Sequence, residues 1–228
     1  MTSAGLLEFA RGPALWFALL VLILGSLWRI VAIWRLGAKP DLSEPRSTRW
    51  LAGALHGIFG RMIPRKEFRH SENLGGLNAY VYHIGLALIV FGYLPHIEFI
   101  ERLTAISWPA LPAAVMYLAV GPTLVSLLIA LQERLADPVR RLLSGCDDYF
   151  SWFVVVLPLA TGMAAINQSV SPGAPPAAPL YPLPVAIHLL SAELLLVWLP
   201  FGKLAHAFLV FFSRGITGAA LARKGAAI

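Results

Sequence analysis

The sequence predicts an all-α integral membrane bundle, a single domain of residues 1–228 with five transmembrane helices. Of the 228 residues, 58% are hydrophobic and only 13% are charged, whereas soluble domains have about a quarter charged residues. Five separate apolar stretches each reach the roughly 20 residues that a spanning helix needs. Cations gather in alternate connections, which predicts the N-terminus outside and the C-terminus in the cytoplasm. We therefore expect a multi-pass protein of the bacterial inner (cytoplasmic) membrane.

The five spans are expected at about residues 13–34, 78–99, 109–131, 149–170 and 183–211. The first is retained rather than cleaved as a signal peptide, because acidic Glu8 precedes it and no small-residue cleavage site closes it. The fourth is followed by a proline-rich turn at 171–179 that has no helix potential. The fifth is longer than the hydrocarbon core, so it has to tilt or project into water.

A short interfacial helix is expected at about residues 50–62, between the first two spans. Leu51, Leu55, Ile58 and Met62 recur there at helical spacing, with Trp50 in front. Such a helix serves either as a docking shelf for a cytoplasmic partner or as a surface anchor on anionic lipid. Both interpretations stay open.

The distribution of basic residues determines the orientation. The connections assigned to the cytoplasm, with the C-terminal tail, contain Arg35, Lys39, Arg46, Arg49, Arg61, Arg65, Lys66, Arg69, Arg134, Arg140, Arg141, Arg214, Arg223 and Lys224. The opposite connections contain only Arg102. The net charge of +6 is therefore a membrane-orientation signal, and we expect no nucleic-acid partner. The single cysteine excludes an internal disulfide, a covalent c-type haem and an iron–sulfur cluster held by this chain alone.

Four histidines inside the apolar stretches carry the most chemical information. His188 and His206 are 18 residues apart, which is five helical turns on one face and about 27 Å along the axis. The topology places His83 and His206 near the inner surface, and His96 and His188 near the outer surface. Two antiparallel helices at equal depth can supply the two axial imidazoles of a b-type haem. We therefore predict two haems b, with these four residues as iron ligands.

The outer ligand set has alternatives. His83 and His96 are 13 residues apart, about 220° around an ideal helix, so they do not share a face. Pro95 redirects His96 if it bends or ends the helix at that point. Otherwise Met116 or Met163, on the outer halves of neighbouring spans, completes the outer haem.

Two segments carry a family resemblance. Residues 82–94, YHIGLALIVFGYL, resemble the second span of the gamma subunit of respiratory nitrate reductases. Residues 187–206, IHLLSAELLLVWLPFGKLAH, resemble the fifth span of that family, in which two haem-ligating histidines have the same separation. Membrane cytochromes of heterodisulfide-reductase-like and sulfite-reduction complexes share this plan. The resemblance places His83, His188 and His206 at ligand positions. The chain departs from the family at Tyr93, where the second histidine of span two is expected, and His96 follows one turn later.

The resemblance implies an electron-transfer subunit between membrane quinone (menaquinone or ubiquinone) and a cytoplasmic iron–sulfur partner, either heterodisulfide-reductase-like or nitrate-reductase-beta-like. A non-redox membrane anchor for a peripheral enzyme is the alternative. The sequence contains no nucleotide-binding glycine loop and no catalytic triad pattern, so we expect no substrate chemistry by this chain alone. Groups that could exchange protons with quinone lie on both sides: Glu98, Glu101, Tyr93, Asn167 and Gln168 outside, and His56, His70 and Lys203 inside.

Overall fold

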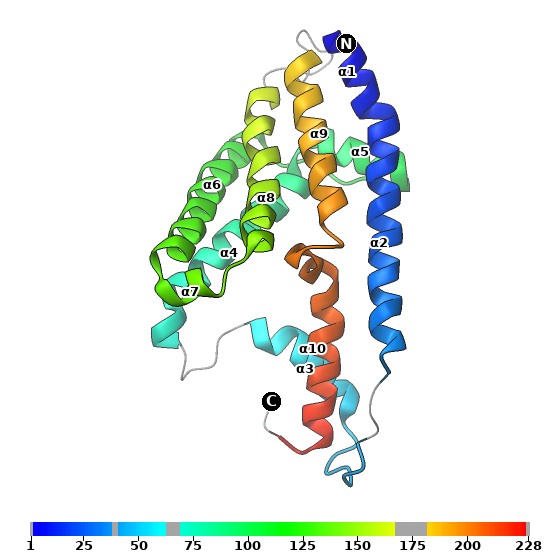
Figure 1. Cartoon of the computed structure of the whole chain (residues 1–228), viewed down its shortest axis with the longest axis vertical. Coiled ribbons are helices and arrows are strands. Elements are labelled where there is room, and N and C mark those ends of the chain that lie inside the picture. The colour runs from blue at the N-terminus through cyan, green and yellow to red at the C-terminus, as the bar shows by residue number, and fades with distance from the viewer. Residues whose placement is uncertain (1, 38–40, 63–68, 167–181, 227–228) are drawn as a thin grey trace. The chain divides into compact units, whose positions relative to one another are not determined.

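Helices make up the regular secondary structure of the described chain, which comprises residues 2–37, 41–62, 69–166 and 182–226 of a computed structural model (Figure 1). Helices long and apolar enough to cross a membrane cover Ser3–Arg35, Leu74–Gly92, Ala113–Ala136, Cys146–Ala165 and Lys203–Arg223. The predicted all-α class with five such helices is confirmed. The chain is a multi-pass transmembrane protein.

The expected membrane domain comprises two compact units. The first unit contains residues 1–20 and 74–198, and the second contains residues 21–73 and 199–228. The N-terminal helix runs from one unit into the other. It consists of α1 (Ser3–Phe9), a π-helical turn (Ala10–Ala14) and α2 (Leu15–Arg35), so it begins well before the predicted span of 13–34. Thr2 caps its start, since its side chain accepts a hydrogen bond from the Gly5 N–H at 3.2 Å.

The predicted span 78–99 is wrong as one continuous helix. Helix α4 (Arg69–Gly92) ends at Gly92, Tyr93 is extended, and α5 (Leu94–Thr104) begins at once. Pro95 lacks the N–H that would bond to the Phe91 carbonyl in a continuous helix. The Trp108 indole N–H donates to that carbonyl instead, at 2.6 Å. The Leu111 N–H likewise donates to the Gly92 carbonyl at 2.9 Å. The carbonyl groups at the interruption therefore accept hydrogen bonds from the following segment.

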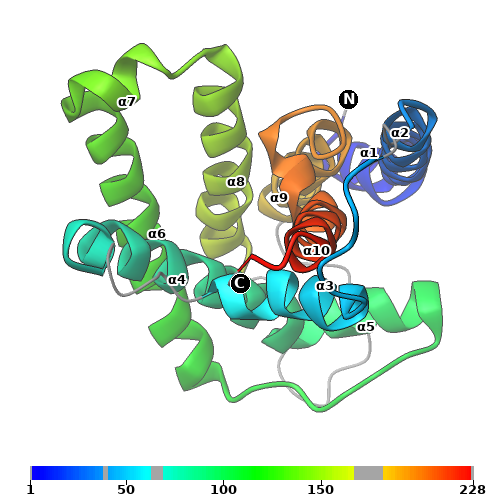
Figure 2. The same cartoon turned by 90° about the horizontal axis from the view of Figure 1, so that it is seen from below.

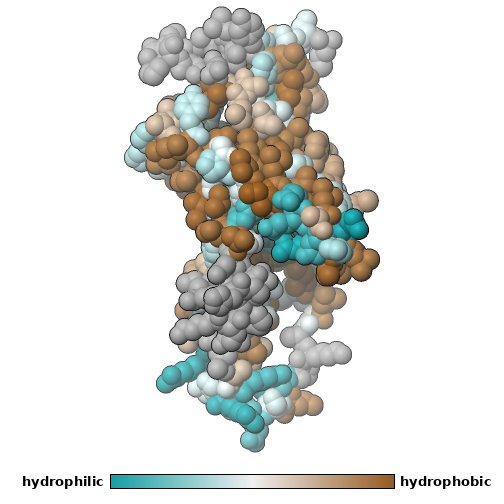
Figure 3. All heavy atoms as spheres, turned by 90° about the vertical axis from the view of Figure 1, so that its left-hand side faces the viewer, coloured by the Kyte–Doolittle hydropathy of each residue, from teal (hydrophilic) through white to brown (hydrophobic). Residues whose placement is uncertain are grey.

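Helices α4 and α6 (Ala113–Ala136) approach each other closely in the first unit. The Asn78 amide donates to the Ser126 carbonyl at 3.0 Å, and the Ser126 hydroxyl donates to the Asn78 side-chain oxygen at 2.6 Å. Nearer the middle, Gly85 packs on Thr123, which is fully buried. Outward-facing side chains of α6 are strongly apolar, with Leu118 74% exposed. The surface on that side is largely hydrophobic (Figure 3), as a lipid-facing surface requires.

Gly85→Ala is expected to lower the free energy of unfolding by about 1–3 kcal/mol. A Cβ at Gly85 would overlap the Thr123 Oγ1 atom and lie 3.0 Å from the Thr123 Cβ. Thr123 is fully buried and its hydroxyl donates to the Ala119 carbonyl at 2.6 Å, so moving it away would disturb both its packing and this hydrogen bond. Thermal unfolding in detergent, followed by loss of helical circular dichroism, measures the change. Gly121→Ala is the control, because nothing lies within 4 Å of a Cβ there; equal unfolding midpoints for the two variants would contradict this packing.

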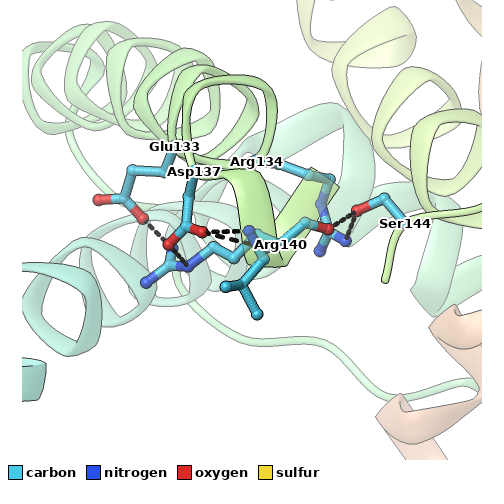
Figure 4. Close-up of polar contacts among 6 residues, drawn as sticks. Glu133, Arg134, Asp137, Arg140 and Ser144 are labelled. Carbon is cyan, nitrogen blue, oxygen red and sulfur yellow. Dashed lines mark hydrogen bonds and ion pairs between the residues drawn. The ribbon is translucent and has the colours of Figure 1, made fainter. Parts of the chain in front are cut away.

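Polar contacts hold the connection between α6 and α8 (Cys146–Ala165). Asp137 caps α7 (Pro138–Leu142) by accepting from the Val139 N–H at 2.8 Å and the Arg140 N–H at 3.1 Å. Arg140 pairs with Glu133, and Arg134 donates to the Ser144 hydroxyl at 2.9 Å (Figure 4). Arg134 also pairs at 2.9 Å with Asp148, whose side chain is only 4% exposed.

The predicted span 183–211 is also wrong as one helix. Helix α9 (Pro182–Trp198) belongs to the first unit, and α10 (His206–Arg223), preceded by a 3₁₀ turn at Lys203–Ala205, belongs to the second. Pro200 is fully buried in the interruption, where a Cβ on Gly25 of α2 would meet its ring at 2.8 Å. Arg29 of α2 donates to the Phe201 carbonyl at 3.3 Å. The helix stops between His188 and His206. The argument that five helical turns place these two residues on a common face therefore does not apply.

The second unit is built on the crossing of α10 with α3 (Trp50–Phe59) (Figures 1 and 2). A 3₁₀ turn at Gly60–Met62 extends α3, so a helix covers the predicted residues 50–62. Gly53 and Gly57 are buried and lie directly on Gly218 of α10. The large apolar residues face outward, and Leu51 is 57% exposed. Small residues at a spacing of four thus bring two backbones into contact.

The segment before α3 is tied to the end of α10. The Arg46 N–H donates to the Arg223 carbonyl at 2.9 Å, and the Arg223 guanidinium donates to the carbonyls of Asp41 at 3.1 Å and Ser43 at 3.0 Å. Hydrogen bonds from Ser43 lower the pKa of the Asp41 carboxyl, helped by the charges of Lys224 and Arg223. Two cation-rich segments that were predicted to share the cytoplasmic side therefore lie together.

Candidate haem-binding site

His96 and His188 lie next to each other in the first unit. His96 comes from the first turn of α5 and His188 from the first half of α9. Their ring centres are 6.1 Å apart and their planes differ by 20°. Two segments separated by more than 90 residues thus place imidazoles side by side within an apolar helical unit.

The helix interruption at Tyr93 positions His96. Its Nδ1 lies 2.9 Å from the Ile89 carbonyl oxygen, in the last turn of α4. Carbonyls in the last turn of a helix have no partner within that helix, so His96 also caps α4. The Tyr93 ring meets the imidazole edge-on at a centre distance of 5.2 Å. Because a carbonyl can only accept, Nδ1 carries the proton and Nε2 keeps the lone pair that binds metal.

His188 is held in the same way from α8. Its Nδ1 lies 3.1 Å from the Pro158 carbonyl oxygen. The Thr161 hydroxyl is hydrogen-bonded to the Ser191 hydroxyl at 2.8 Å, which links α8 to α9 beside the ring. A Cβ on Gly162 would lie 3.1 Å from the His188 Cε1 atom. The glycine therefore leaves room for the imidazole between the two helices.

The spacing of this pair is the one that axial ligation of a haem would need. Two imidazoles that bind one metal from opposite sides at about 2 Å place their ring centres roughly 6 Å apart. A hydrogen bond from Nδ1 to a carbonyl is the usual support of a metal-binding histidine. No cluster of three or more His, Cys, Asp or Glu that could hold a metal occurs within the described ranges. Two imidazoles suffice for haem, because the porphyrin supplies the other four nitrogens.

The alternative ligands Met116 and Met163 lie in different surroundings. Met116 is 4% exposed and its methyl group packs near Gly92, at the end of α4. Met163 is 52% exposed. His96 is the residue whose ring lies against His188, as expected if Pro95 ends the helix.

His83 and His206 lie in different units. His83 is exposed on α4, with its Nδ1 2.7 Å from the Ala79 carbonyl oxygen and its ring 4.5 Å from that of Tyr82. His206 is exposed at the start of α10, with its Nδ1 2.8 Å from the Lys203 carbonyl oxygen. All four histidines thus direct Nδ1 to a backbone carbonyl. The pairing of His83 with His206 stays a prediction.

The residues considered for proton exchange with quinone are dispersed. Glu98 and Glu101 are exposed on α5, and Glu101 accepts from the Ser107 hydroxyl at 3.1 Å. His56 is exposed on α3. Asn167, Gln168 and the proline-rich turn lie outside the described residues, as does the side chain of His70. Glu193, a buried carboxyl of α9, is a further candidate that the histidine pattern does not identify. Its signal in the sequence is a carboxylate within an apolar stretch.

The comparisons with known proteins give one relative. It is a curated protein of Nitratidesulfovibrio vulgaris (strain Hildenborough), which carries only the name "Protein". It is 28% identical over 226 residues, which cover 96% of this chain and 95% of the relative. No family model and no solved structure match the chain. The chain is thus similar over almost its whole length to a protein of the same size.

Proposed function

We propose that this chain is the membrane-bound b-type cytochrome subunit of a respiratory redox complex. It transfers electrons between the quinone pool and a cytoplasmic iron–sulfur partner. The observation that carries the proposal is the pair of imidazoles at 6.1 Å, each oriented by a backbone carbonyl. The resemblance of residues 82–94 and 187–206 to the nitrate reductase gamma subunit supports the same function.

Each haem b would supply a one-electron redox centre. His96 and His188 would hold the outer haem, and His83 and His206 the inner one. The Nδ1–H hydrogen bonds keep each imidazole in one tautomer and one orientation, which raises its basicity as a ligand. Apolar helices around the site exclude water, and this shapes the redox potential of a haem.

The cytoplasmic partner would meet the inner side of the chain. The exposed apolar face of α3 offers such a surface, and the cations Arg61, Arg65 and Lys66 follow α3 in the sequence; the side chains of these three lie outside the described part. The same face suits anionic lipid. The partner is an iron–sulfur subunit of the heterodisulfide-reductase-like or nitrate-reductase-beta-like kind.

Reduction by quinol tests the proposal. Addition of a menaquinol or ubiquinol analogue to the purified chain is expected to produce the visible bands of reduced b-type haem. Dithionite applied to the same sample gives the full reduction against which the quinol is compared. A non-redox membrane anchor would give no b-type bands with either reagent, and haem that only dithionite reduces would contradict the link to quinone.

A further inference from the structure

Glu193 is a buried carboxyl that takes no part in the proposed haem ligation. Its side chain belongs to α9 and is only 6% exposed. Neither carboxylate oxygen makes a hydrogen bond with any of the described residues. In the first unit, α9 lies between α8 and the N-terminal helix (Figures 1 and 2).

Glu193 points away from α8. Ser191, which is hydrogen-bonded to Thr161 of α8, is about 200° around the helix from Glu193. Ala186, which is fully buried, lies seven residues earlier, so it is within about 20° of Glu193. Elements that pack on α9 from other directions include α1 and the π-helical turn, and α5 places His96 beside His188. Glu193 therefore lies on the face of α9 opposite the one that is hydrogen-bonded to α8.

The charged and titratable groups on the elements that pack on α9 are exposed or interact with residues other than Glu193. Glu8 of α1 and Arg11 of the π-helical turn are exposed, as are Glu98, Glu101 and Arg102 of α5. On α8, such groups are confined to the first turn: Cys146, Asp147, Asp148 and Tyr149. Asp148 is paired with Arg134, and Asp147 accepts from the Ser151 hydroxyl at 3.0 Å. Glu193 thus lies among apolar helices without a counter-ion from its neighbours in the described chain.

Such a carboxyl is a natural proton carrier. Burial of an ionised carboxylate without a partner is very costly, whereas the protonated acid is uncharged. Glu193 also follows His188 by five residues, about 7.5 Å along the helix axis. The two side chains leave the helix about 140° apart, so their separation exceeds this rise. In an apolar interior, a charge on Glu193 still interacts with a change of charge at the His188 imidazole.

We propose that the Glu193 carboxyl is a redox-linked proton site, which binds one proton when the centre held by His96 and His188 gains one electron. It releases that proton when the electron leaves. This inference rests on the proposed function. A membrane quinol or the reduced iron–sulfur partner supplies the electron, and the surrounding water or the quinol supplies the proton, so charge and atoms balance. The added electron makes the site more negative, and the carboxylate then binds its proton more tightly.

Infrared difference spectra between the reduced and oxidised protein test the inference directly. The native chain is expected to show a carboxylic-acid C=O band that Glu193→Gln loses and Glu8→Gln keeps, because Glu8 is exposed on α1. The midpoint potential of the outer centre is expected to fall with rising pH in the native chain, and to lose most of that dependence in Glu193→Gln. Glu193→Asp, which retains a carboxyl, should keep both signals.

The outcomes separate the two proposals. If Glu193→Gln binds haem normally and leaves both the band and the pH dependence unchanged, the proton role is overturned while the cytochrome assignment stands. If the folded chain shows no b-type bands at all, the proposed function fails, and the redox-linked role fails with it. An acid band of Glu193 in the absolute infrared spectrum of the haem-free chain would then still report that this carboxyl holds a proton.

Discussion

His188→Ala is expected to remove one of two b-type haems and to leave the other in place. The imidazole of His188 is one of the two axial ligands that we assign to the outer centre, and alanine cannot bind iron. The bound haem per chain should fall by about half, and the reduced-minus-oxidised spectrum should keep the bands of the inner centre. His56→Ala is the matched control, because His56 is exposed on α3 and lies outside the proposed ligand set.

The second proposed ligand of the outer haem, His96, is tested by the same measurement. His96→Ala should reproduce the loss seen in His188→Ala, because the two rings lie 6.1 Å apart. Met116→Leu and Met163→Leu should keep both haems. If His96→Ala retained the outer haem and a methionine variant lost it, a thioether rather than an imidazole would be the sixth ligand.

Gly218→Ala is expected to separate α3 from α10 and to destabilise the second unit by about 3 kcal/mol, at the upper end for overpacking. A Cβ there would overlap the Gly53 carbonyl oxygen and lie 3.0 Å from the Gly57 Cα. These obstacles are backbone atoms, so no rotamer change can relieve them. Trypsin cleavage after the exposed Arg49, next to α3, should become faster as α3 detaches.

A control on the same helix separates this clash from a general effect of alanine. At Gly215 a Cβ would make an ordinary contact with Ile58, at 3.5 Å from its Cδ1 atom. Gly215→Ala should therefore leave trypsin cleavage unchanged. Similar cleavage rates for Gly218→Ala and Gly215→Ala would show that the glycine crossing does not hold α3.

The helical class, the number of long apolar helices and the helix at 50–62 could be predicted from the sequence, because they depend on local hydrophobic runs and spacing. The interruption near Pro95 was one of two possibilities that the sequence left open, and the interruption near Pro200 could not be predicted. Prolines occur inside α6 at Pro122 and inside α8 at Pro158, and these helices continue. Near Pro95 and Pro200 the helices stop. The difference lies in distant partners, since Trp108 satisfies the Phe91 carbonyl and Gly25 makes room for the Pro200 ring.

The proximity of two of the four histidines was predictable in the same way. Equal depth in the membrane predicted His96 opposite His188, and the structure places their rings together. The argument from helical phase that linked His188 to His206 is wrong, because it assumed one continuous helix. Gly162 carries no local signal of its role, since the need for a glycine arises only where His188 packs on α8. The carboxylate of Glu193 was visible in the sequence, but its burial without a partner follows only from the packed structure.

The most direct test of the cytochrome assignment is the reduced-minus-oxidised visible spectrum of the purified chain, combined with the amount of haem extracted per chain. Four imidazoles with carbonyl-bound Nδ1 predict b-type bands and two non-covalently bound haems. A folded, fully helical chain that shows no b-type bands and carries no haem after expression with haem supplied would contradict the assignment.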